Sequence, residues 1–283
     1  MSLSGGLKAQ GGLAALRQVK PNLAAFVAFL RRTPRGGHGT VMGSWSGRVV
    51  IGAAVTLAVL AAVVVTIDAW AVTQSRALPP ALHSLFATIT EFGKSGWFLW
   101  PIGLFLVLLA LVASPRIGRF GLLVIAAISV RLTFVFTAIA LPGLFVAIIK
   151  RLIGRARPFV DGSANPNLYD PFAWKAAYAS LPSGHATTAF AAAVAIGALW
   201  PQARPYVWIY ALLIAVSRVI ITAHHPSDVL AGAAVGAIGA VLVRNWFAAR
   251  RLAFTIDADG RVHRLAVPSW RRIKTVARQL RAA

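Results

Sequence analysis

Residues 217–228, SRVIITAHHPSD, place ionisable side chains around the end of a hydrophobic run. Arg218 lies inside the run, and His224, His225 and Asp228 follow where it ends. An ionised residue inside a membrane span costs about 2.5–3.5 kcal/mol on insertion scales, so a function is expected of the arginine. An imidazole that a carboxylate orients can act as a nucleophile or as a proton carrier.

Two further polar groups also adjoin long apolar runs. In KRLIGRARP, Lys150 is followed after six residues by Arg157, and in LPSGHATTA, Ser183, Gly184 and His185 open an apolar run. Each group has a purely structural interpretation. Lys150 could snorkel to the lipid headgroups, and Ser183 could simply be a helix N-cap. Separate structural reasons for all three groups would, however, have to coincide at one membrane face.

Together the three groups have the chemistry of a phosphate site. Lys150, Arg157 and Arg218 supply fixed positive charge, and a guanidinium group can bind phosphate oxygens through two hydrogen bonds. The backbone N–H groups of a helix start provide an anion site, and Gly184 would let a ligand approach them closely. Two histidines and one carboxylate complete the groups that phosphoryl transfer needs.

The composition predicts that a lipid bilayer surrounds these residues. The chain has 283 residues, of which 58% are hydrophobic and only 13% charged, with a mean hydropathy of +0.72. A soluble domain usually has about a quarter of charged residues. The sequence contains no cysteine, which excludes disulfides, thiolate metal sites and a thiol nucleophile.

The net charge of +22 is concentrated in the two ends of the chain. Residues 1–48 contain seven Lys and Arg and no acid, and residues 250–283 contain nine Lys and Arg and two Asp. Because these tails flank apolar spans, sorting to the cytoplasm and attraction to anionic lipid headgroups explain them better than nucleic-acid binding does. No cleavable signal peptide is expected, and residues 22–30 could form a helix on the membrane surface.

The hydrophobic pattern predicts an all-α integral membrane protein with six transmembrane helices in a bundle. The expected spans are 49–72, 97–113, 120–149, 182–200, 206–223 and 228–247. The apolar segment 78–93 is too broken for a span and is expected at the membrane interface. The expected domains are a basic N-terminal tail (1–48), the six-span domain (49–247) and a basic C-terminal tail (248–283). In the last span, Gly232, Gly236 and Gly239 are spaced for close helix packing.

Six spans place both tails on one side of the membrane, and their bases make that side the cytoplasm. Lys150, Arg151, Arg155 and Arg157 then lie on the outer side, where basic residues should be rare. An anionic ligand would explain this exception. We therefore expect an active site at the outer membrane face.

The three groups closely resemble the three-part signature of the type 2 phosphatidic acid phosphatase superfamily, which also includes vanadium haloperoxidases. The matching positions are Lys150 with Arg157-Pro158, then Pro182 through His185, then Ser217-Arg218 with His224 and Asp228. The motifs lie within residues 150–228, and the six-span layout extends the resemblance to about 49–247. No signature position departs from the family pattern.

The resemblance implies an integral membrane phosphatase that acts on a lipid phosphate or diphosphate without a cofactor or metal. It implies that His224 attacks phosphorus and forms a phosphohistidine, that Asp228 orients His224, and that His185 protonates the leaving oxygen. The phosphoryl group would be held by Lys150, Arg157, Ser183, Gly184 and Arg218. His225 fills a variable position. Residues four apart on a helix share a face, which favours His224 as the partner of Asp228, although Pro226 could start the helix between them.

Other functions remain open from the sequence. A lipid phosphotransferase would use the same intermediate but pass the phosphoryl group to another lipid. A haloperoxidase would share the pocket, but six apolar spans argue against it. A transporter or a non-catalytic lipid-binding protein would need the bases but not a nucleophile and an acid. A metal site built from His185, His224 and Asp228 is conceivable, but the surrounding bases would repel a divalent cation.

The substrate is expected to be a lipid whose headgroup faces the periplasm, in the inner membrane of a bacterium. Candidates are undecaprenyl diphosphate, phosphatidic acid, phosphatidylglycerol phosphate and the 1-phosphate of lipid A. The segment 159–180 is expected to cover the site, with Phe172, Trp174 and Tyr178 at the membrane interface. Outside the motifs, Arg131 is expected either to pair with a carbonyl or carboxylate inside the bundle or to snorkel to the headgroups.

Overall fold

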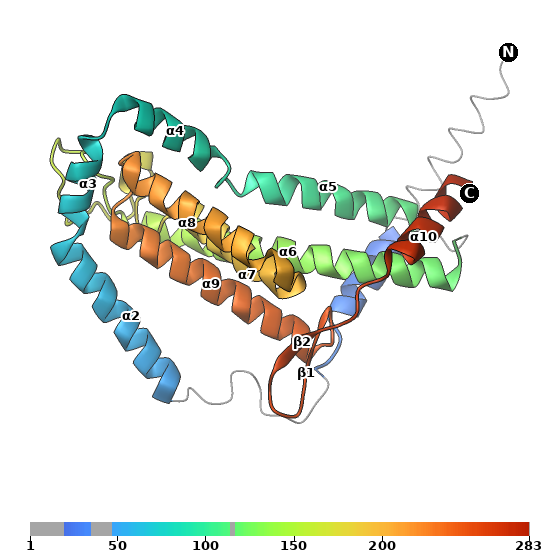
Figure 1. Cartoon of the computed structure of the whole chain (residues 1–283). Coiled ribbons are helices and arrows are strands. Elements are labelled where there is room, and N and C mark those ends of the chain that lie inside the picture. The colour runs from blue at the N-terminus through green and yellow to red at the C-terminus, as the bar shows by residue number, and fades with distance from the viewer. Residues whose placement is uncertain (1–19, 35–46, 114–116, 283) are drawn as a thin grey trace, which may run out of the picture. The chain divides into compact units, whose positions relative to one another are not determined.

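The computed structural model describes residues 20–34, 47–113 and 117–282, and most of this chain is helical (Figure 1). Its first helix is Lys20–Leu30, within which the predicted surface segment 22–30 lies. The other elements are α2 (Gly47–Thr66), α3 (Asp68–Arg76), α4 (Pro80–Glu91), α5 (Gly96–Val112), α6 (Gly118–Ile153), η2 (Ala176–Tyr178), α7 (Gly184–Leu199), η3 (Pro201–Ala203), α8 (Arg204–Ile220), α9 (Pro226–Ala249), β1 (Phe254–Ile256), β2 (Val262–Arg264) and α10 (Trp270–Ala282). The predicted helical architecture is confirmed.

Several of these helices are long and apolar enough to cross a membrane. Within the described ranges they are Pro80–Val112, Gly118–Ile153, Pro201–Ile220 and Pro226–Ala249. The pair α2 and α3 adds a fifth if it is one broken span, with a bend of 50°. α7 has 16 residues, about 24 Å at 1.5 Å per residue, less than a hydrocarbon core of about 30 Å. The chain is a multi-pass membrane protein with four or five helices of spanning length, where the sequence predicts six.

The segment 78–93 is more regular than the sequence predicts. It contains α4, which begins at Pro80, a position that suits proline because the first N–H groups of a helix lack intrahelical partners. After a turn at residues 92–95 the chain continues into α5. The helix is therefore interrupted only at this turn, and residues 80–91 form one continuous helix.

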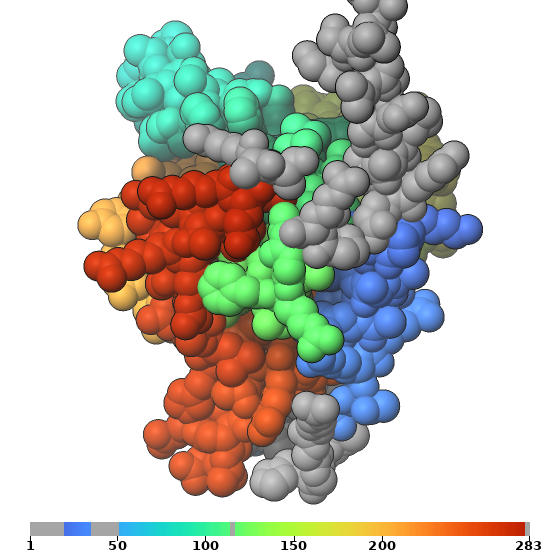
Figure 2. All heavy atoms as spheres, turned by 90° about the vertical axis from the view of Figure 1, so that its right-hand side faces the viewer, coloured from blue at the N-terminus to red at the C-terminus, as the bar shows by residue number. Residues whose placement is uncertain are grey.

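The chain forms two compact units whose residues alternate along the sequence. The first unit combines the described parts of 1–37, 100–136 and 245–283. In it, α10 packs its apolar face on α5 and α6, and Figure 2 shows α10 (red) against the start of α6 (green). The core of this contact consists of Leu109, Ile117, Val124, Ile125 and Val276. The basic side chains of Arg271, Arg272, Lys274 and Arg278 on α10 are exposed.

Arg131 lies inside the first unit and pairs with backbone carbonyls. Its side chain is only 7% exposed. It donates to the carbonyl of Ala127 at 2.7 Å. It also donates to the carbonyls of two residues that follow β2, Leu265 at 3.0 Å and Ala266 at 2.7 Å. This confirms the buried alternative for Arg131 and excludes snorkelling. The arginine attaches the irregular segment that follows β2 to α6.

The second unit combines the described part of 38–99 with 137–244 and contains all three motifs. Within it α7 lies beside α8 and is composed largely of small, buried residues (Figure 1). A side chain at Gly232 or Gly236 of α9 would collide with the α7 backbone, and one at Gly239 with Pro142 of α6. The predicted packing role of these glycines is confirmed. α7 is thus closely packed against α8 and α9. The motifs meet at its N-terminal end.

Candidate active site

The first motif lies where α6 ends and the chain becomes extended. Gly154 has a left-handed conformation (φ +64°), and a side chain there would collide with the backbone of Asp170. Backbone hydrogen bonds hold the extended segment from both sides. The Asp170 N–H donates to the Gly154 carbonyl at 2.7 Å, and the Arg157 N–H donates to the Ala177 carbonyl at 2.8 Å. Lys150 on the last turn of α6 and Arg157 are thereby held near one another.

The second motif opens α7. Ser183 is the N-cap residue, as the alternative structural interpretation has it, but its fully buried side chain makes no capping hydrogen bond. Its N–H donates instead to the carbonyl of Asp228 at 2.9 Å, which joins the start of α7 to the start of α9. Gly184 and His185 form the first turn. A Cβ atom at Gly93 would lie 2.9 Å from Cδ2 of His185, so the glycine leaves room for the imidazole.

The third motif lies between α8 and α9. α8 ends at Ile220, before the predicted end at position 223, because the chain turns back and the His224 N–H donates to the Arg218 carbonyl at 3.2 Å. Arg218 therefore lies in the last turn of α8, closer to the helix end than the predicted span 206–223 implies. α9 begins at Pro226, so His224 precedes the helix and Asp228 lies in its first turn.

The three motifs converge around the two histidines His185 and His224. The His185 ring lies close enough to His224, and to Arg218 and Arg157 of the other motifs, for their charges to act on it. Burial, opposed by Asp228 and reinforced by the charges of Arg218 and Arg157, lowers the pKa of His224 to about 4. The imidazole of His224 is therefore neutral at pH 7 and able to act as a nucleophile.

One buried polar atom from each motif has no hydrogen-bond partner among the described residues. These atoms are Nε of Arg157, Oγ of Ser183 and Nε of Arg218. The other end of the Arg218 side chain is held, since Nη1 donates to Oγ1 of Thr90 at 2.7 Å. Buried donors are normally paired, and three from separate segments can be satisfied by the oxygens of one anion. The arrangement fits a phosphoryl group.

A serine hydroxyl lies between the ring of His224 and the carboxylate of Asp228. Nδ1 of His224 lies 3.8 Å from Oδ2 of Asp228, which is ion-pair distance but too long for a hydrogen bond. Oγ of Ser180 donates to that oxygen at 2.6 Å and lies 3.3 Å from Nδ1 of His224. Since the hydroxyl donates its hydrogen to the carboxylate, Oγ can accept a hydrogen bond from Nδ1–H. This tautomer leaves the lone pair on Nε2 of His224.

The neighbouring His225 also lies close to the same carboxylate. Its Nδ1 is 3.5 Å from Oδ2 of Asp228, and its backbone N–H donates to that oxygen at 2.9 Å. Its side chain is completely buried, however, and neither ring nitrogen has a hydrogen-bond partner in the described part of the chain. Distance to Asp228 alone therefore does not distinguish the two histidines. The proximity of Arg157 and Arg218 favours His224 as the reactive one.

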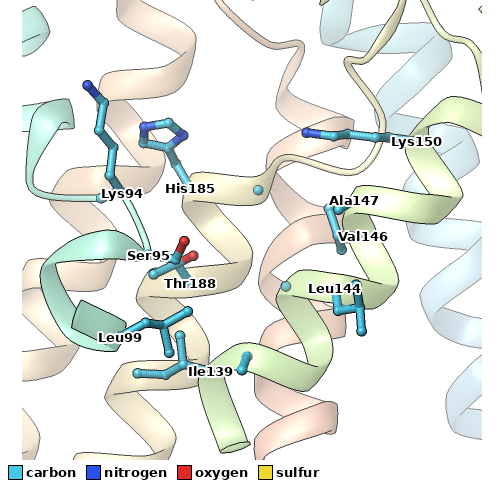
Figure 3. A pocket seen from close by; sticks show the side chains of 14 residues that line it. Lys94, Ser95, Leu99, Ile139, Leu144, Val146, Ala147, Lys150, His185 and Thr188 are labelled. Atoms are coloured by element: carbon cyan, nitrogen blue, oxygen red, sulfur yellow. The ribbon is translucent and has the colours of Figure 1, made fainter. Parts of the chain in front are cut away.

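A cavity of about 400 Å³ lies beside this cluster (Figure 3). Figure 3 shows Lys94 and His185 together at one end, with Lys150 extending toward the same end from α6. The other end is apolar and includes Leu99 and Ile139. The cavity therefore combines a cationic end with an apolar end.

Of the predicted site residues, the lining of this cavity includes Lys150, Gly184 and His185. The others lie in the cluster next to it: Arg157, Ser183, Arg218, His224 and Asp228. The structure thus brings the predicted site residues of all three motifs into one region of the second unit. Ser180, the last residue of the segment 159–180, contacts the site; that the segment covers the site stays a prediction. Of the predicted interfacial side chains, Phe172 and Trp174 are exposed and Tyr178 is half-buried.

Four residues that contact the site were assigned no site role from the sequence. Arg155 was named only among the bases that an anionic ligand would explain, whereas it pairs with two carboxylates. Asp68 and Arg155 form a buried ion pair that reaches Asp228, Ser180 bridges Asp228 and His224, and Lys94 lines the cavity. Asp68 had a signal, because an acid inside the apolar run 49–72 is costly without a partner. Among the described residues, no group of three or more His, Cys, Asp or Glu is placed to hold a metal ion.

The fold and site define a multi-pass helical membrane protein with a cationic, histidine-containing site that suits a phosphate group. The model of the PAP2 superfamily matches residues 131–252. The chain is 32% identical over 189 residues to a lipid A 1-phosphatase of Rhizobium etli, covering 64% of this chain and 78% of that protein. The chain belongs to the PAP2 superfamily and is a membrane phosphatase.

Other similarities are shorter or lower in identity. A decaprenylphosphoryl-5-phosphoribose phosphatase of Mycobacterium tuberculosis is 33% identical over 166 residues, covering 58% of this chain and 80% of that protein. Among solved structures, LpxE of Aquifex aeolicus aligns with a TM-score of 0.46 and 21% identity, covering 63% of this chain and 94% of that chain. A phosphatidylglycerolphosphate phosphatase of Bacillus subtilis aligns with a TM-score of 0.44 and 21% identity, over 70% and 94%.

Proposed function

We propose that this protein hydrolyses a lipid phosphate or diphosphate through a phosphohistidine on His224, without a metal ion. The observation that carries the proposal is the set of unpaired buried donors, one from each motif, that surrounds two histidines. The cavity beside them is cationic at one end and apolar at the other, as the two parts of a lipid phosphate require.

In the first step Nε2 of His224 attacks phosphorus, and the bond from phosphorus to the lipid oxygen breaks. His185, which enters this step protonated, gives a proton to that oxygen as it leaves and becomes neutral. In the second step His185 takes a proton from water, whose oxygen attacks the phosphohistidine and releases inorganic phosphate and neutral His224. Asp228, through Ser180, stabilises the positive charge that the ring of His224 acquires.

The phosphoryl oxygens are held by fixed donors. Lys150, Arg157 and Arg218 provide charge, and Oγ of Ser183 and the N–H of Gly184 provide further hydrogen bonds at the start of α7. Because these cations stand where a metal ion would neutralise the phosphate, the mechanism needs none. They would also repel a divalent cation from His185, His224 and Asp228.

The substrate is a membrane lipid. The apolar end of the cavity favours a hydrocarbon chain, and similarity to lipid A 1-phosphatases makes the 1-phosphate of lipid A the first substrate to test. The similarity to a decaprenylphosphoryl-5-phosphoribose phosphatase supports a polyprenyl lipid as the next, such as undecaprenyl diphosphate. Phosphatidic acid and phosphatidylglycerol phosphate complete the candidates, and the segment 159–180 would select among them.

We propose that the site faces the periplasm and that both basic tails are in the cytoplasm. The tails carry seven Lys and Arg in residues 1–48 and nine in residues 250–283, a bias typical of the cytoplasmic side. With α7 counted as a short sixth span, residues 49–247 form the phosphatase domain of an inner-membrane protein. The exposed bases of α10 would contact anionic headgroups.

Phosphate release by the purified protein from this panel of lipids, in EDTA, tests the proposal. We expect release from at least one lipid, loss of release in His224→Ala, and inhibition by orthovanadate, whose five-coordinate form resembles the transition state. Activity that disappears in EDTA and returns with Mg²⁺ or Zn²⁺ would contradict the metal-free mechanism. Transfer of labelled phosphate to a second lipid instead of water would identify a phosphotransferase.

A further inference from the structure

A buried polar cluster outside the three motifs lies directly behind Asp228. The guanidinium group of Arg155 donates from Nη2 to Oδ2 of Asp68 at 2.8 Å and from Nη1 to Oδ1 of Asp228 at 2.6 Å. Nη1 also donates to Oγ of Ser227 at 2.7 Å, and Nε donates to the carbonyl of Pro166 at 2.8 Å. Arg155 thus joins two carboxylates from distant parts of the chain.

Asp68 also binds the start of α9. Its Oδ1 accepts from the N–H of Ser227 at 2.9 Å, and its Oδ2 accepts from the hydroxyl of the same residue at 2.5 Å. A carboxylate is favoured at a helix N-terminus, where N–H groups lack intrahelical partners. Asp68 is the first residue of α3, next to the bend between α2 and α3. The cluster therefore connects this bend to the start of α9.

The charges in the cluster are fully buried and do not balance. The side chains of Asp68 and Asp228 are 0% exposed and that of Arg155 is 1% exposed. One guanidinium group therefore serves two carboxylates, so each competes for it. As long as Asp68 holds Nη2, Arg155 contacts Asp228 through Nη1 alone.

In this arrangement the two carboxylate oxygens of Asp228 have different hydrogen-bond partners. Oδ1 accepts from Arg155, whereas Oδ2 accepts from Ser180 and from the backbone N–H of His225 and faces Nδ1 of His224. A carboxylate bound on both oxygens has a single orientation. Its negative charge is also only partly neutralised, because Arg155 is shared.

We propose that Asp68 and Arg155 are positioning residues that hold Asp228 with Oδ2 directed toward Ser180 and His224. They contact neither substrate nor reacting atoms and act through Asp228. The inference rests on the proposed phosphohistidine mechanism, in which Asp228 stabilises the charged ring of His224. It assigns a role in the reaction to Asp68, which lies 160 residues before Asp228 in the chain.

Asp68→Asn is the most informative variant. The amide keeps the size of the side chain and can still accept from Ser227, but it releases the charge that competes for Arg155. Both Nη atoms of Arg155 can then bind Asp228, as guanidinium and carboxylate groups favour, and draw Oδ2 away from Ser180. We expect kcat to fall on the order of 10- to 100-fold, the range typical of residues that orient a site's ligands.

Two readouts separate positioning from a merely structural role. KM should stay within about twofold of the wild type, because Lys150, Arg157 and Arg218 are unchanged and still hold the phosphate. In an Asp228→Asn background, Asp68→Asn should cause little further loss of kcat, since the residue through which it acts is already altered. Single-turnover assays with ³²P-labelled lipid phosphate can measure these low rates. Asp161→Asn, which removes an exposed carboxylate, is the matched control.

Wild-type kcat in folded Asp68→Asn would overturn the proposal, as would an equal further loss in the Asp228→Asn background. If Asp68→Asn does not fold, Ser227→Ala replaces it, because it removes the hydroxyl between Asp68 and Arg155 without unpairing a charge. Lower kcat in Ser227→Ala with unchanged KM supports the proposal, and unchanged kcat overturns it. Wild-type and His224→Ala assays run in parallel would reveal a failure of the proposed function itself.

Discussion

The hydroxyl of Ser180 donates a hydrogen bond of 2.6 Å to the carboxylate of Asp228. Both side chains are completely buried. The same hydroxyl oxygen lies 3.3 Å from Nδ1 of His224, closer to it than the 3.8 Å between this nitrogen and the carboxylate. The serine is therefore the direct neighbour of the proposed nucleophile, and the carboxylate acts through it.

Ser180→Ala should lower kcat on the order of 10-fold, the effect of losing one hydrogen bond to a charged group. KM should change little, because the alanine leaves the phosphate-binding cations in place. Steady-state kinetics with the preferred lipid checks this, with Ser163→Ala, a change at an exposed serine, as the control. Unaltered kcat in Ser180→Ala would mean that His224 is oriented by Asp228 without the serine.

His224→Ala should abolish turnover and leave no acid-labile phosphoprotein after incubation with ³²P-labelled substrate. His225→Ala should keep substantial activity and still form the labelled intermediate. Since the side chain of His225 is completely buried, this variant should lose about 1–3 kcal/mol of unfolding free energy. A folded His225→Ala protein without label, beside a labelled His224→Ala protein, would reverse the assignment.

His224 should remain neutral well below the usual pKa of histidine. Burial lowers its pKa to about 4, and the neutral ring is the nucleophilic form, so protonation should remove activity only as the pH falls through about 4. NMR titration of ¹³C-labelled histidine in detergent measures this pKa directly. The His224 signal is the one missing from His224→Gln. A midpoint near 6.5 would show that the ring is solvated rather than buried.

Arg131→Leu should destabilise the protein, because the carbonyls of Ala127, Leu265 and Ala266 lose their donor. The expected loss is about 1–3 kcal/mol, the cost of leaving buried acceptors unpaired. Thermal unfolding in detergent measures it against Arg119→Leu, which removes an exposed arginine from the same helix. Equal melting temperatures in the two variants would argue against a stabilising role of these hydrogen bonds.

The proposed sidedness can be tested with single cysteines, since the chain has none. A cysteine at Ser163 should react with an impermeant thiol reagent added to intact spheroplasts. A cysteine at Ser2 or Ala283 should react only after lysis, because the bases of the tails favour the cytoplasm. Labelling of the tails but not of position 163 from outside would place the site in the cytoplasm and remove periplasmic lipids from the candidate substrates.

The sequence by itself determined the class of the protein and most of its candidate site. Long apolar runs require a membrane, because an exposed apolar surface of that length is unfavourable in water. The motifs could be read because each is local. Lys150 and Arg157, or His224 and Asp228, lie a few residues apart, and their spacing is visible along the chain.

Only the tertiary structure decided which distant residues complete the site. Asp68 and Arg155 are 87 residues apart, and their ion pair depends on how α3 and the segment after α6 pack. Hydrophobic periodicity specifies which faces are buried but not which helices meet, so it did not predict this pair. An acid in the apolar run 49–72 was a signal that a partner must exist, but the prediction did not use it. Its identity followed from packing, which brings one buried guanidinium group within reach of two carboxylates.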